Sequence, residues 1–225
     1  MDTMPMLKSR RRLFGFFTAV VAGWLTFCNA ASASELSGRA LVEALRAGGL
    51  TIYFRHTQTD WSKDDHVGAY GDWQSCDPEK IRQLSDAGRA TAKAVGQAIR
   101  ALAIPVSRVL SSEYCRAKET VALMELGPVE TTPDIMNLRS ADYVGGRAAA
   151  IGRIRKIFAT LVAPGGNVVI GAHGNLIQAS TGIYPGEGGS AVFRADPNAE
   201  HGFSPVARLD PKDWAALARQ FANGG

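Results

Sequence analysis

Short apolar runs alternate with stretches of helical periodicity along most of this chain. The run Leu50–Phe54 is rich in β-branched and aromatic side chains and follows the helix breaker Gly48-Gly49, which is typical of a short buried strand. Similar runs predict further strands, and apolar residues three and four positions apart predict helices between them. The predicted strands are Leu50–Phe54, Val106–Leu110, Pro128–Thr132, Asn167–Gly171, Ser190–Arg194 and Pro205–Leu209. The predicted helices are Ser37–Ala47, Ser85–Leu102, Glu113–Met124, Ala148–Leu161, Asn175–Thr181 and one that starts at Asp210-Pro211.

The alternation of strands and helices predicts an α/β fold with a mostly parallel central sheet, and the last two strands predict a hairpin at its edge. Residues 57–80 show little periodicity and many Asp, Gly and Trp residues. A loop of this length in a compact domain usually has a function. Because it starts directly after Arg55-His56, we expect it to line or cover a binding site.

The first 33 residues have the three parts of an export signal. Lys8–Arg12 is basic, Leu13–Phe27 is mostly apolar, and Ala31-Ser32-Ala33 is a small-residue cleavage site, which predicts a mature domain of residues 34–225. The apolar run is shorter than the ~20 residues of a membrane span, so an uncleaved anchor is a weaker alternative and we expect no stable membrane insertion after cleavage. The protein is predicted to be periplasmic or secreted, and the adjacent arginines leave the Sec and Tat export routes both open.

Charge and histidine content argue against two classes of function. The formal net charge is +4, but +3 of it lies in residues 1–33, which leaves +1 for the predicted mature domain. A nearly neutral domain gives no reason to expect nucleic-acid binding. The four histidines include no pair spaced i and i+4, which argues against a zinc site. We therefore expect neither a nucleic-acid partner nor a bound metal.

Three of the predicted strands end at a cation or an imidazole. Arg55-His56 follows the first strand, Arg116 lies in the first turns of the helix after the second, and His173 follows the fourth. Ligands of open α/β sheets bind outside the carboxyl ends of the strands, and a strand-to-helix turn offers free backbone N–H groups to an anion. Parallel strands would therefore bring these four side chains together in one anion site.

These segments resemble the motifs of the histidine phosphatase superfamily, branch 1. The quoted motifs are Arg55-His56, the Ser-Ser-x-x-x-Arg-Ala segment Ser111–Ala117, the second histidine motif Gly171–Gly174, and the helix start Leu84–Arg89. The resemblance covers about residues 50–194. It implies the phosphoglycerate mutase-like fold, which is a three-layer α/β sandwich with a mostly parallel central sheet.

The resemblance implies a chemistry as well as a fold. His56 would be the nucleophile and form a phosphohistidine that water later hydrolyses, and an imidazole is largely neutral at pH 7 as this requires. Arg55, Arg116 and His173 would bind the phosphoryl oxygens through charge-assisted hydrogen bonds. His173 would be protonated in this role, and a bound phosphate would favour that form. No metal or other cofactor is implied.

The chain departs from the resembled family at the proton donor. Many members have a mid-chain Glu, where this sequence has Leu138 in the segment Met136–Arg139. Two carboxylates are the candidates to replace it. Glu187 lies on the Gly-rich turn Tyr184–Gly189, and Asp142 lies near the altered motif. Glu187 is favoured because the short helix after His173 and this turn would return it to the site.

The cysteines have two possible roles. Loss of the leader would remove Cys28 and leave Cys76 and Cys115. In an oxidising compartment an even number of cysteines favours a disulfide, and two buried thiols are the alternative. Cys115 is a poor candidate for a thiolate nucleophile, because thiolate phosphatases place five residues between Cys and Arg, whereas Arg116 follows here at once.

The sequence thus predicts an exported, metal-independent phosphomonoesterase. A phosphoglycerate mutase-like phosphotransferase is an alternative that export disfavours, because glycolytic intermediates are not found outside the cytoplasm. A phosphate-ligand binding module without turnover is a second alternative, which the missing mid-chain acid motivates. The substrate is expected to be a phosphorylated small molecule, a cell-envelope component or a phosphorylated protein. The segments that would select it, Thr57–Lys80 and Ser140–Arg147, carry no readable pattern, and the oligomeric state is left open.

Overall fold

The structure is a computed structural model that describes Met1 and residues 35–222. Apart from Met1, the predicted export signal lies outside the described residues, so it stays a prediction. Within residues 35–222, none of the helices has the length and apolar character that a membrane crossing requires.

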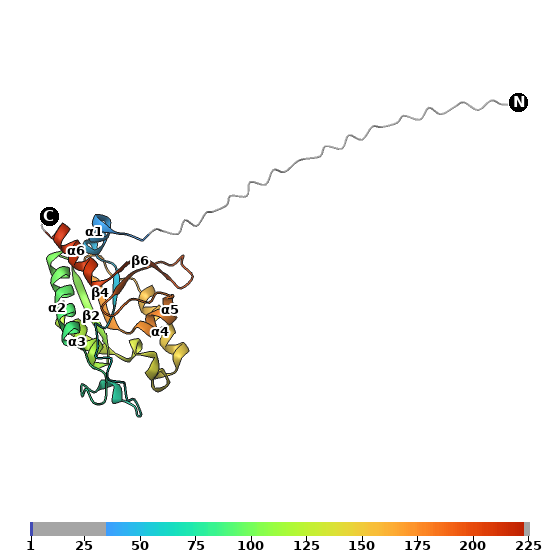
Figure 1. The fold of residues 1–225 in the computed structure, drawn as a ribbon. Helices are drawn as coiled ribbons and strands as arrows, with labels where there is room; N and C mark the ends of the chain where they lie inside the picture. Colours follow the sequence, from blue (N-terminus) through green and yellow to red (C-terminus); the bar gives the residue numbers. More distant parts are fainter. Residues whose placement is uncertain (2–34, 223–225) are drawn as a thin grey trace. The chain divides into compact units, whose positions relative to one another are not determined.

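A six-stranded sheet in the order β3-β2-β4-β1-β5-β6 forms the centre of the fold (Figure 1). The first four strands run parallel to one another, and β5 is antiparallel to both β1 and β6. The strands are β1 Thr51–Arg55, β2 Val106–Ser112, β3 Val129–Thr132, β4 Asn167–Ala172, β5 Ser190–Ala195 and β6 Phe203–Leu209. The predicted mostly parallel sheet with a hairpin at one edge is therefore confirmed.

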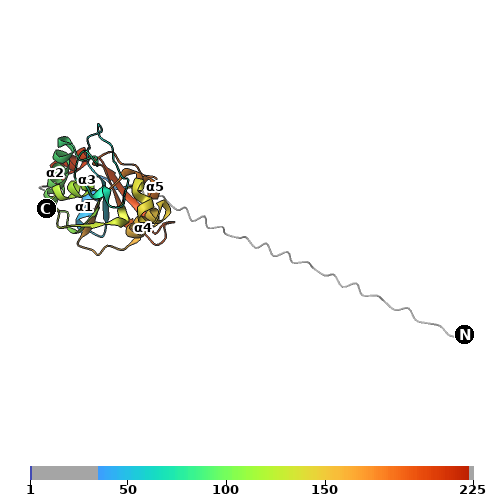
Figure 2. The same ribbon diagram turned by 90° about the horizontal axis from the view of Figure 1, so that it is seen from below.

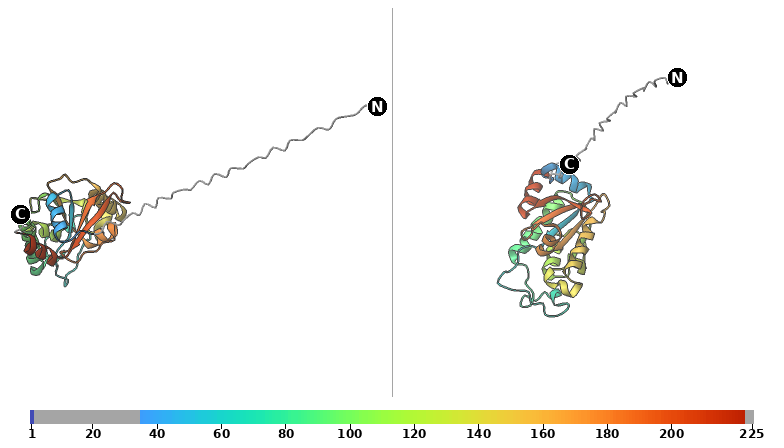
Figure 3. Two further views of the ribbon diagram at one scale, coloured as in Figure 1. Left: turned by 90° about the horizontal axis from the view of Figure 1, so that it is seen from above. Right: turned by 90° about the vertical axis from the view of Figure 1, so that its right-hand side faces the viewer.

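Helices cover both faces of the sheet and complete a three-layer sandwich. α1, α2, α3 and α6 pack on one face, whereas α4 and α5 pack on the other (Figure 1). Figure 2 and Figure 3 show the same separation from other directions. The helices are α1 Gly38–Ala47, α2 Asp86–Ala101, α3 Cys115–Leu123, α4 Arg147–Ala159, α5 Gly174–Thr181 and α6 Pro211–Phe221.

The central strands are buried on both sides because each face carries a helical layer. In β1, Ile52 and Phe54 belong to the core beneath α1, α2 and α6, whereas Tyr53 belongs to the core beneath α4. β4 repeats the alternation with Val169 and Ile170. A slip by one residue would exchange these faces, so the apolar pattern fixes the register of β1 against β4. The carboxyl ends of β1, β2 and β4 consequently lie at one edge of the sheet.

Two segments differ from the prediction. β2 continues to Ser112, so α3 starts at Cys115 and not at Glu113. The segment after β3 forms two short 3-10 helices, η2 Pro133–Ile135 and η3 Leu138–Val144. A 3-10 helix has three residues per turn, so the period of 3.6 that predicts α-helices does not reveal it.

The long loop after β1 is irregular apart from the 3-10 turn η1, Asp72–Gln74. A disulfide joins Cys76 in this loop to Cys115 at the start of α3, with the Cα atoms 5.4 Å apart. The predicted disulfide is therefore confirmed. Because Cys115 directly precedes Arg116, the bridge fixes the loop next to one of the expected site residues.

Serine at both Cys76 and Cys115 is expected to lower the free energy of unfolding by about 3–4 kcal/mol. The bridge joins residues 39 positions apart and restricts the unfolded chain accordingly. Urea denaturation of the variant and the wild type measures the difference. Wild-type protein in reductant is the matched control, because it should unfold at the same midpoint as the variant. A wild-type midpoint that does not respond to reductant would contradict the prediction.

Candidate active site

The ends of β1 and β4 place two histidines side by side. Arg55 pairs with Ala172 in the parallel ladder, so His56 and His173 are the next residues of adjacent strands. The His56 N–H extends the ladder by donating to the Ala172 carbonyl at 2.9 Å. The centroids of the two imidazole rings are 5.7 Å apart, and both residues are buried. The structure thus brings the two predicted histidines together.

Tyr53 holds the backbone of His173 in place. Its phenol accepts a hydrogen bond from the His173 N–H at 2.9 Å and donates one to the His173 carbonyl at 2.8 Å. Burial raises the pKa of Tyr53, so the phenol stays protonated and able to donate. Tyr53 is therefore a fixed support for His173, a role that its place in an apolar strand did not reveal.

The hydrogen bond of His56 decides which of its ring nitrogens is reactive. Nδ1 lies 2.9 Å from the carbonyl oxygen of Thr57. Because a carbonyl oxygen only accepts, Nδ1 carries the proton. Burial, and after it the positive charge of Arg116, lowers the pKa of His56 well below its ordinary value, so the ring is neutral near pH 7. Nε2 therefore has a free lone pair, as a nucleophile requires.

His173 is bonded through both of its ring nitrogens. Nε2 lies 2.8 Å from Ser112 Oγ, and Nδ1 lies 3.3 Å from Asn137 Nδ2. An amide nitrogen donates, so Nδ1 accepts and Nε2 carries the proton. Burial, followed by Arg116, also lowers the pKa of His173. The ring is thus neutral in the free protein, and the protonated form expected for phosphate binding would arise only when an anion binds.

The lowered pKa values of His56 and His173 predict a loss of stability in mild acid. Below a pH of about 6.5 these histidines take up protons in the unfolded chain, whereas in the folded protein they stay neutral until a lower pH. Stability should therefore fall with falling pH, by up to about 1.4 kcal/mol per pH unit for each histidine. Urea denaturation at several pH values between about 7.5 and 5.5 measures this slope. The variant His173→Gln should show a smaller slope, and a flat profile in the wild type would contradict the prediction.

Arg55 reaches the site beside Tyr184. Its guanidinium donates to the Pro185 carbonyl at 3.1 Å, and it lies 5.1 Å from the centroid of the Tyr184 ring and 3.8 Å from the Glu187 carboxylate. Gly174 leaves room for this side chain, since a Cβ there would lie 2.8 Å from the Tyr184 ring and 3.0 Å from Arg55 Cδ. The glycine that opens α5 is therefore required for Arg55 to enter the site.

Arg116 does not face the site directly, because Asp65 covers it. Nη1 and Nη2 of Arg116 donate to the two carboxylate oxygens of Asp65 at 2.8 and 2.9 Å. The two side chains are 0% and 2% exposed. Asp65 thus occupies the guanidinium fork in which the sequence predicted a phosphoryl group. Arg116 can offer these two nitrogens to a phosphoryl group only after Asp65 has moved.

Thr120 joins the two arginine motifs. Its hydroxyl accepts from the Thr57 N–H at 3.1 Å and donates to the Arg116 carbonyl at 2.8 Å. Thr120 is fully buried, which shields both bonds from water. The backbone that follows His56 is therefore tied to the helix that carries Arg116.

A cavity of about 150 Å³ opens at this edge of the sheet. Its lining consists of Arg55, His56, Trp61, Asp65, Arg82, Asn137, Arg139, His173, Gly174, Asn175 and Tyr184. Three arginines outnumber the single carboxylate in this lining, so the cavity suits an anion. Arg82, Arg139 and Asp65 were not predicted, because they come from the long loop and from η3, which show no periodic pattern.

The two predicted proton donors are not part of the cavity lining. The Glu187 carboxylate accepts hydrogen bonds from Thr59 Oγ1 at 2.9 Å and from Trp61 Nε1 at 3.2 Å, next to its contact with Arg55. Glu187 is therefore held beside the site. Asp142 is exposed on η3. Asp65 is instead the carboxylate that lines the cavity.

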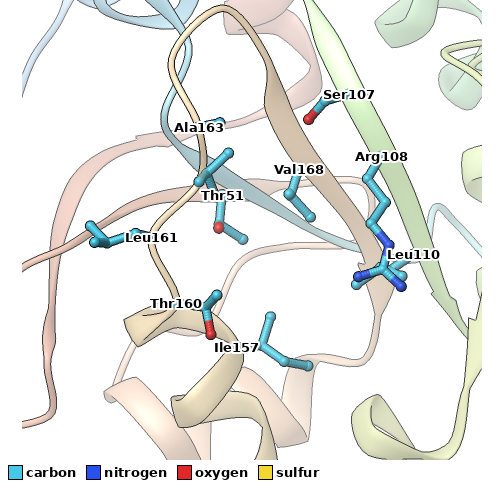
Figure 4. Close-up of a pocket in the computed structure, with 10 residues that line it drawn as sticks. Thr51, Ser107, Arg108, Leu110, Ile157, Thr160, Leu161, Ala163 and Val168 are labelled. Carbon is cyan, nitrogen blue, oxygen red and sulfur yellow. The ribbon is translucent and has the colours of Figure 1, made fainter.

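A second cavity, of about 390 Å³, lies at the opposite ends of the strands (Figure 4). Thr51 at the start of β1, Val168 of β4 and Thr160 after α4 are among its lining residues. Its single charged side chain, Arg108, pairs with Glu130. Neither a histidine nor a carboxylate lines this cavity, so it lacks the groups expected of a phosphatase site.

We compared the chain with known protein families and solved structures. The profile of the histidine phosphatase superfamily (branch 1) matches residues 52–155. No curated protein matches the chain. A candidate phosphohistidine phosphatase, SixA, of Nakamurella multipartitia superposes with a TM-score of 0.50 and 18% identity, over 72% of this chain and 96% of that chain. At such low identity this similarity shows the fold alone.

Two further solved structures superpose with lower scores. A mycobacterial glucosyl-3-phosphoglycerate phosphatase has a TM-score of 0.48 and 20% identity, over 70% of this chain and 96% of that chain. A phosphoserine phosphatase variant of Entamoeba histolytica with bound phosphoserine has a TM-score of 0.49 and 14% identity, over 73% of this chain and 98% of that chain.

The matched residues and the site coincide. Arg55, His56 and Arg116 lie inside the matched range, and β4 adds His173 at the same edge of the sheet. The six-stranded α/β sandwich is the fold of the structural neighbours. Residues 52–155 match the histidine phosphatase superfamily, branch 1, and the domain that contains them shares the fold of the Nakamurella structure.

Proposed function

We propose that this protein is an exported phosphomonoesterase that works without a metal, through a phosphohistidine on His56. The observation that carries the proposal is the free Nε2 lone pair of His56, which lies beside His173 in an arginine-lined cavity. The match of residues 52–155 to the histidine phosphatase superfamily supports phosphatase chemistry. A neutral imidazole is a sufficient nucleophile by itself, which is the basis for leaving out a metal.

Two displacements at phosphorus make up the reaction. In the first, His56 Nε2 forms a bond to phosphorus, the bond to the ester oxygen breaks, and that oxygen receives a proton. In the second, water attacks phosphorus, the P–N bond breaks and inorganic phosphate leaves. The His56 Nδ1–H stays bonded to the Thr57 carbonyl, which stabilises the positive ring of the intermediate. Arg55, Arg116 and His173 bind the nonbridging oxygens.

Substrate binding exchanges one anion of Arg116 for another. A carboxylate and a phosphoryl group fit the same guanidinium fork, so the phosphoryl group takes the place of Asp65. Asn137 lines the cavity and its contact with His173 Nδ1 is long, at 3.3 Å, so Nδ1 is the nitrogen that the phosphoryl group approaches. The negative charge then raises the pKa of His173 and allows Nδ1–H to donate.

Glu187 is proposed as the proton donor, with Asp65 as the alternative. A carboxylate displaced by a phosphoryl group binds a proton more readily, because a like charge lies next to it. Loss of the true donor should slow the hydrolysis of alkyl phosphates by about 10²–10⁴-fold and that of 4-nitrophenyl phosphate much less. Rates for Glu187→Gln and Asp65→Asn, with the exposed Asp142→Asn as the matched control, identify the donor. Unchanged rates in all three would transfer the role to water.

Turnover of 4-nitrophenyl phosphate by residues 34–225 tests the proposal. We expect phosphate release that persists in excess EDTA. Phosphate binding without release would support the binding-module alternative. Transfer of the phosphoryl group to added glycerate, in preference to water, would support the mutase-like alternative.

Export is tested separately by expressing the full chain in a bacterial host. N-terminal sequencing of the protein recovered from the periplasm or medium should begin at Ser34. A chain that keeps Met1 and remains in the cytoplasm would contradict export and leave the phosphatase proposal intact.

A further inference from the structure

We infer that Arg82 and Arg139 form a second anion-binding subsite in the cavity, which takes a carboxylate or phosphate on the leaving group of the substrate. The inference rests on the proposed function and narrows its substrate class. The preferred substrates are phosphomonoesters that carry a second anionic group.

Arg82 is a buried cation without an anionic partner. The residue is 7% exposed, it lines the cavity, and its buried Nε has no hydrogen-bond partner in the described part of the chain. None of the carboxylates in residues 35–222 forms an ion pair with its guanidinium. The carboxylates of Asp65 and Glu187 act on the Arg82 charge only from beyond ion-pair distance, so an anionic ligand in the cavity would be its direct partner.

Trp61 orients the Arg82 guanidinium without satisfying it. The guanidinium carbon lies 3.8 Å from the centroid of the Trp61 ring, and Trp61 Nε1 is itself fixed by its bond to Glu187. A ring face attracts the positive charge but accepts none of the N–H groups at the edge of the guanidinium plane in the way an anion does. The stacked guanidinium therefore keeps donors for a ligand.

Arg139 adds a second positive charge to the same wall. Its side chain lines the cavity, is exposed, and forms no ion pair with any carboxylate of the described residues. Both arginines line the same cavity, and the pKa of Arg82 is lowered first by burial, then by Arg116, and in smaller part by Arg139. Two like charges held near each other at a cavity are complementary to an anion.

The phosphoryl group itself does not need these two arginines. In the proposed function its nonbridging oxygens are bound by Arg55, by Arg116 once Asp65 has moved, and by His173 once its ring is protonated. The Arg82 carbonyl accepts from Arg116 Nη1 at 3.2 Å, so the subsite adjoins the phosphoryl position. A group on the leaving alcohol is therefore the part of the substrate that meets Arg82 and Arg139.

Two matched pairs of substrates test the inference. 3-Phosphoglycerate differs from glycerol 3-phosphate by a carboxylate in place of a hydroxymethyl group, and glucose 1,6-bisphosphate differs from glucose 6-phosphate by a second phosphate. We expect kcat/KM to be about tenfold higher for the doubly anionic member of at least one pair, with the gain in KM. The pair that shows the gain identifies the anion as carboxylate or phosphate.

Two single variants test whether Arg82 and Arg139 cause the preference for doubly anionic esters. Arg139→Gln and Arg82→Gln should each lower the preference to less than about threefold, because kcat/KM should fall more for the doubly anionic ester than for its partner. Arg147→Gln is the matched control, because Arg147 is exposed and does not line the cavity. The exposed position of Arg139 makes its variant informative even where Arg82→Gln does not fold. Equal kcat/KM values within both pairs, or a preference that survives Arg139→Gln, would overturn the subsite.

A failure of the subsite is distinguishable from a failure of the proposed function. Turnover of all four esters without preference removes the subsite and leaves the phosphatase. If none of the esters is turned over, calorimetric Kd values for 3-phosphoglycerate and glycerol 3-phosphate replace kcat/KM. Tighter binding of 3-phosphoglycerate that disappears in Arg139→Gln then supports the subsite on a protein that does not catalyse, and equal Kd values refute it.

Discussion

Replacing His56 with alanine is expected to abolish phosphate release, with a loss of about 10⁴-fold or more in kcat. Among the described residues that line the cavity, the variant lacks the imidazole nitrogen that has no protein partner, because both nitrogens of His173 are hydrogen-bonded. The phosphoryl-binding residues stay in place, so phosphate binding should persist while turnover is lost. Initial rates on 4-nitrophenyl phosphate and calorimetry with inorganic phosphate measure the two properties.

His66→Ala is the matched control for this variant, because His66 lies in the loop after β1 and is exposed. It should retain the wild-type rate. Brief incubation with a ³²P-labelled ester, followed by alkaline denaturation, should label the wild-type protein and not His56→Ala. If His56→Ala keeps wild-type turnover, a phosphohistidine on this residue takes no part in the reaction.

Replacing Arg116 with alanine is expected to destabilise the fold as well as the site. The change leaves the Asp65 carboxylate buried without its partner, which typically costs about 3–5 kcal/mol. It also removes a donor for the phosphoryl group, so turnover should fall sharply at a temperature where the variant is still folded. Urea denaturation and initial rates separate the two effects.

The double variant Arg116→Met/Asp65→Leu separates the buried pair from the chemistry. Replacing both charged groups by apolar side chains of similar size is often neutral or stabilising, so stability should return to near the wild-type value. Activity should not return, because the phosphoryl donor is still absent. Wild-type stability in the single variant Arg116→Ala would show that the ion pair is not buried in solution, and recovered activity in the double variant would exclude Arg116 from phosphoryl binding.

The sequence was informative where the site follows from strand geometry. His56 and His173 were expected to meet because parallel strands bring their carboxyl ends to one edge, and the pairing of Arg55 with Ala172 does this. Tyr53 was predicted as a core residue, but its two hydrogen bonds to His173 depend on a partner 120 residues away. Local sequence patterns do not predict a contact between residues so far apart in the chain.

The long loop was the part that sequence could not resolve. Asp60, Asp64 and Asp65 lie within six positions of one another in an aperiodic segment, and nothing local distinguishes the one that enters the site. The path of the loop is set by distant contacts, including the disulfide of Cys76 with Cys115. Arg82 was not predicted as a site residue for the same reason. The choice between Glu187 and Asp142 as proton donor depended on the path of a turn, which local sequence does not determine.

Turnover requires the native register of β1 against β4, so activity measures whether these strands have paired correctly. Side chains alternate between the two faces of a strand, so a shift of one residue between these strands would turn one imidazole away from the other. A collapsed intermediate with native-like helices and misaligned strands would therefore be inert. During refolding, the return of turnover should count only molecules whose central strands are aligned, and it should lag behind the recovery of helical circular dichroism by the time that alignment takes.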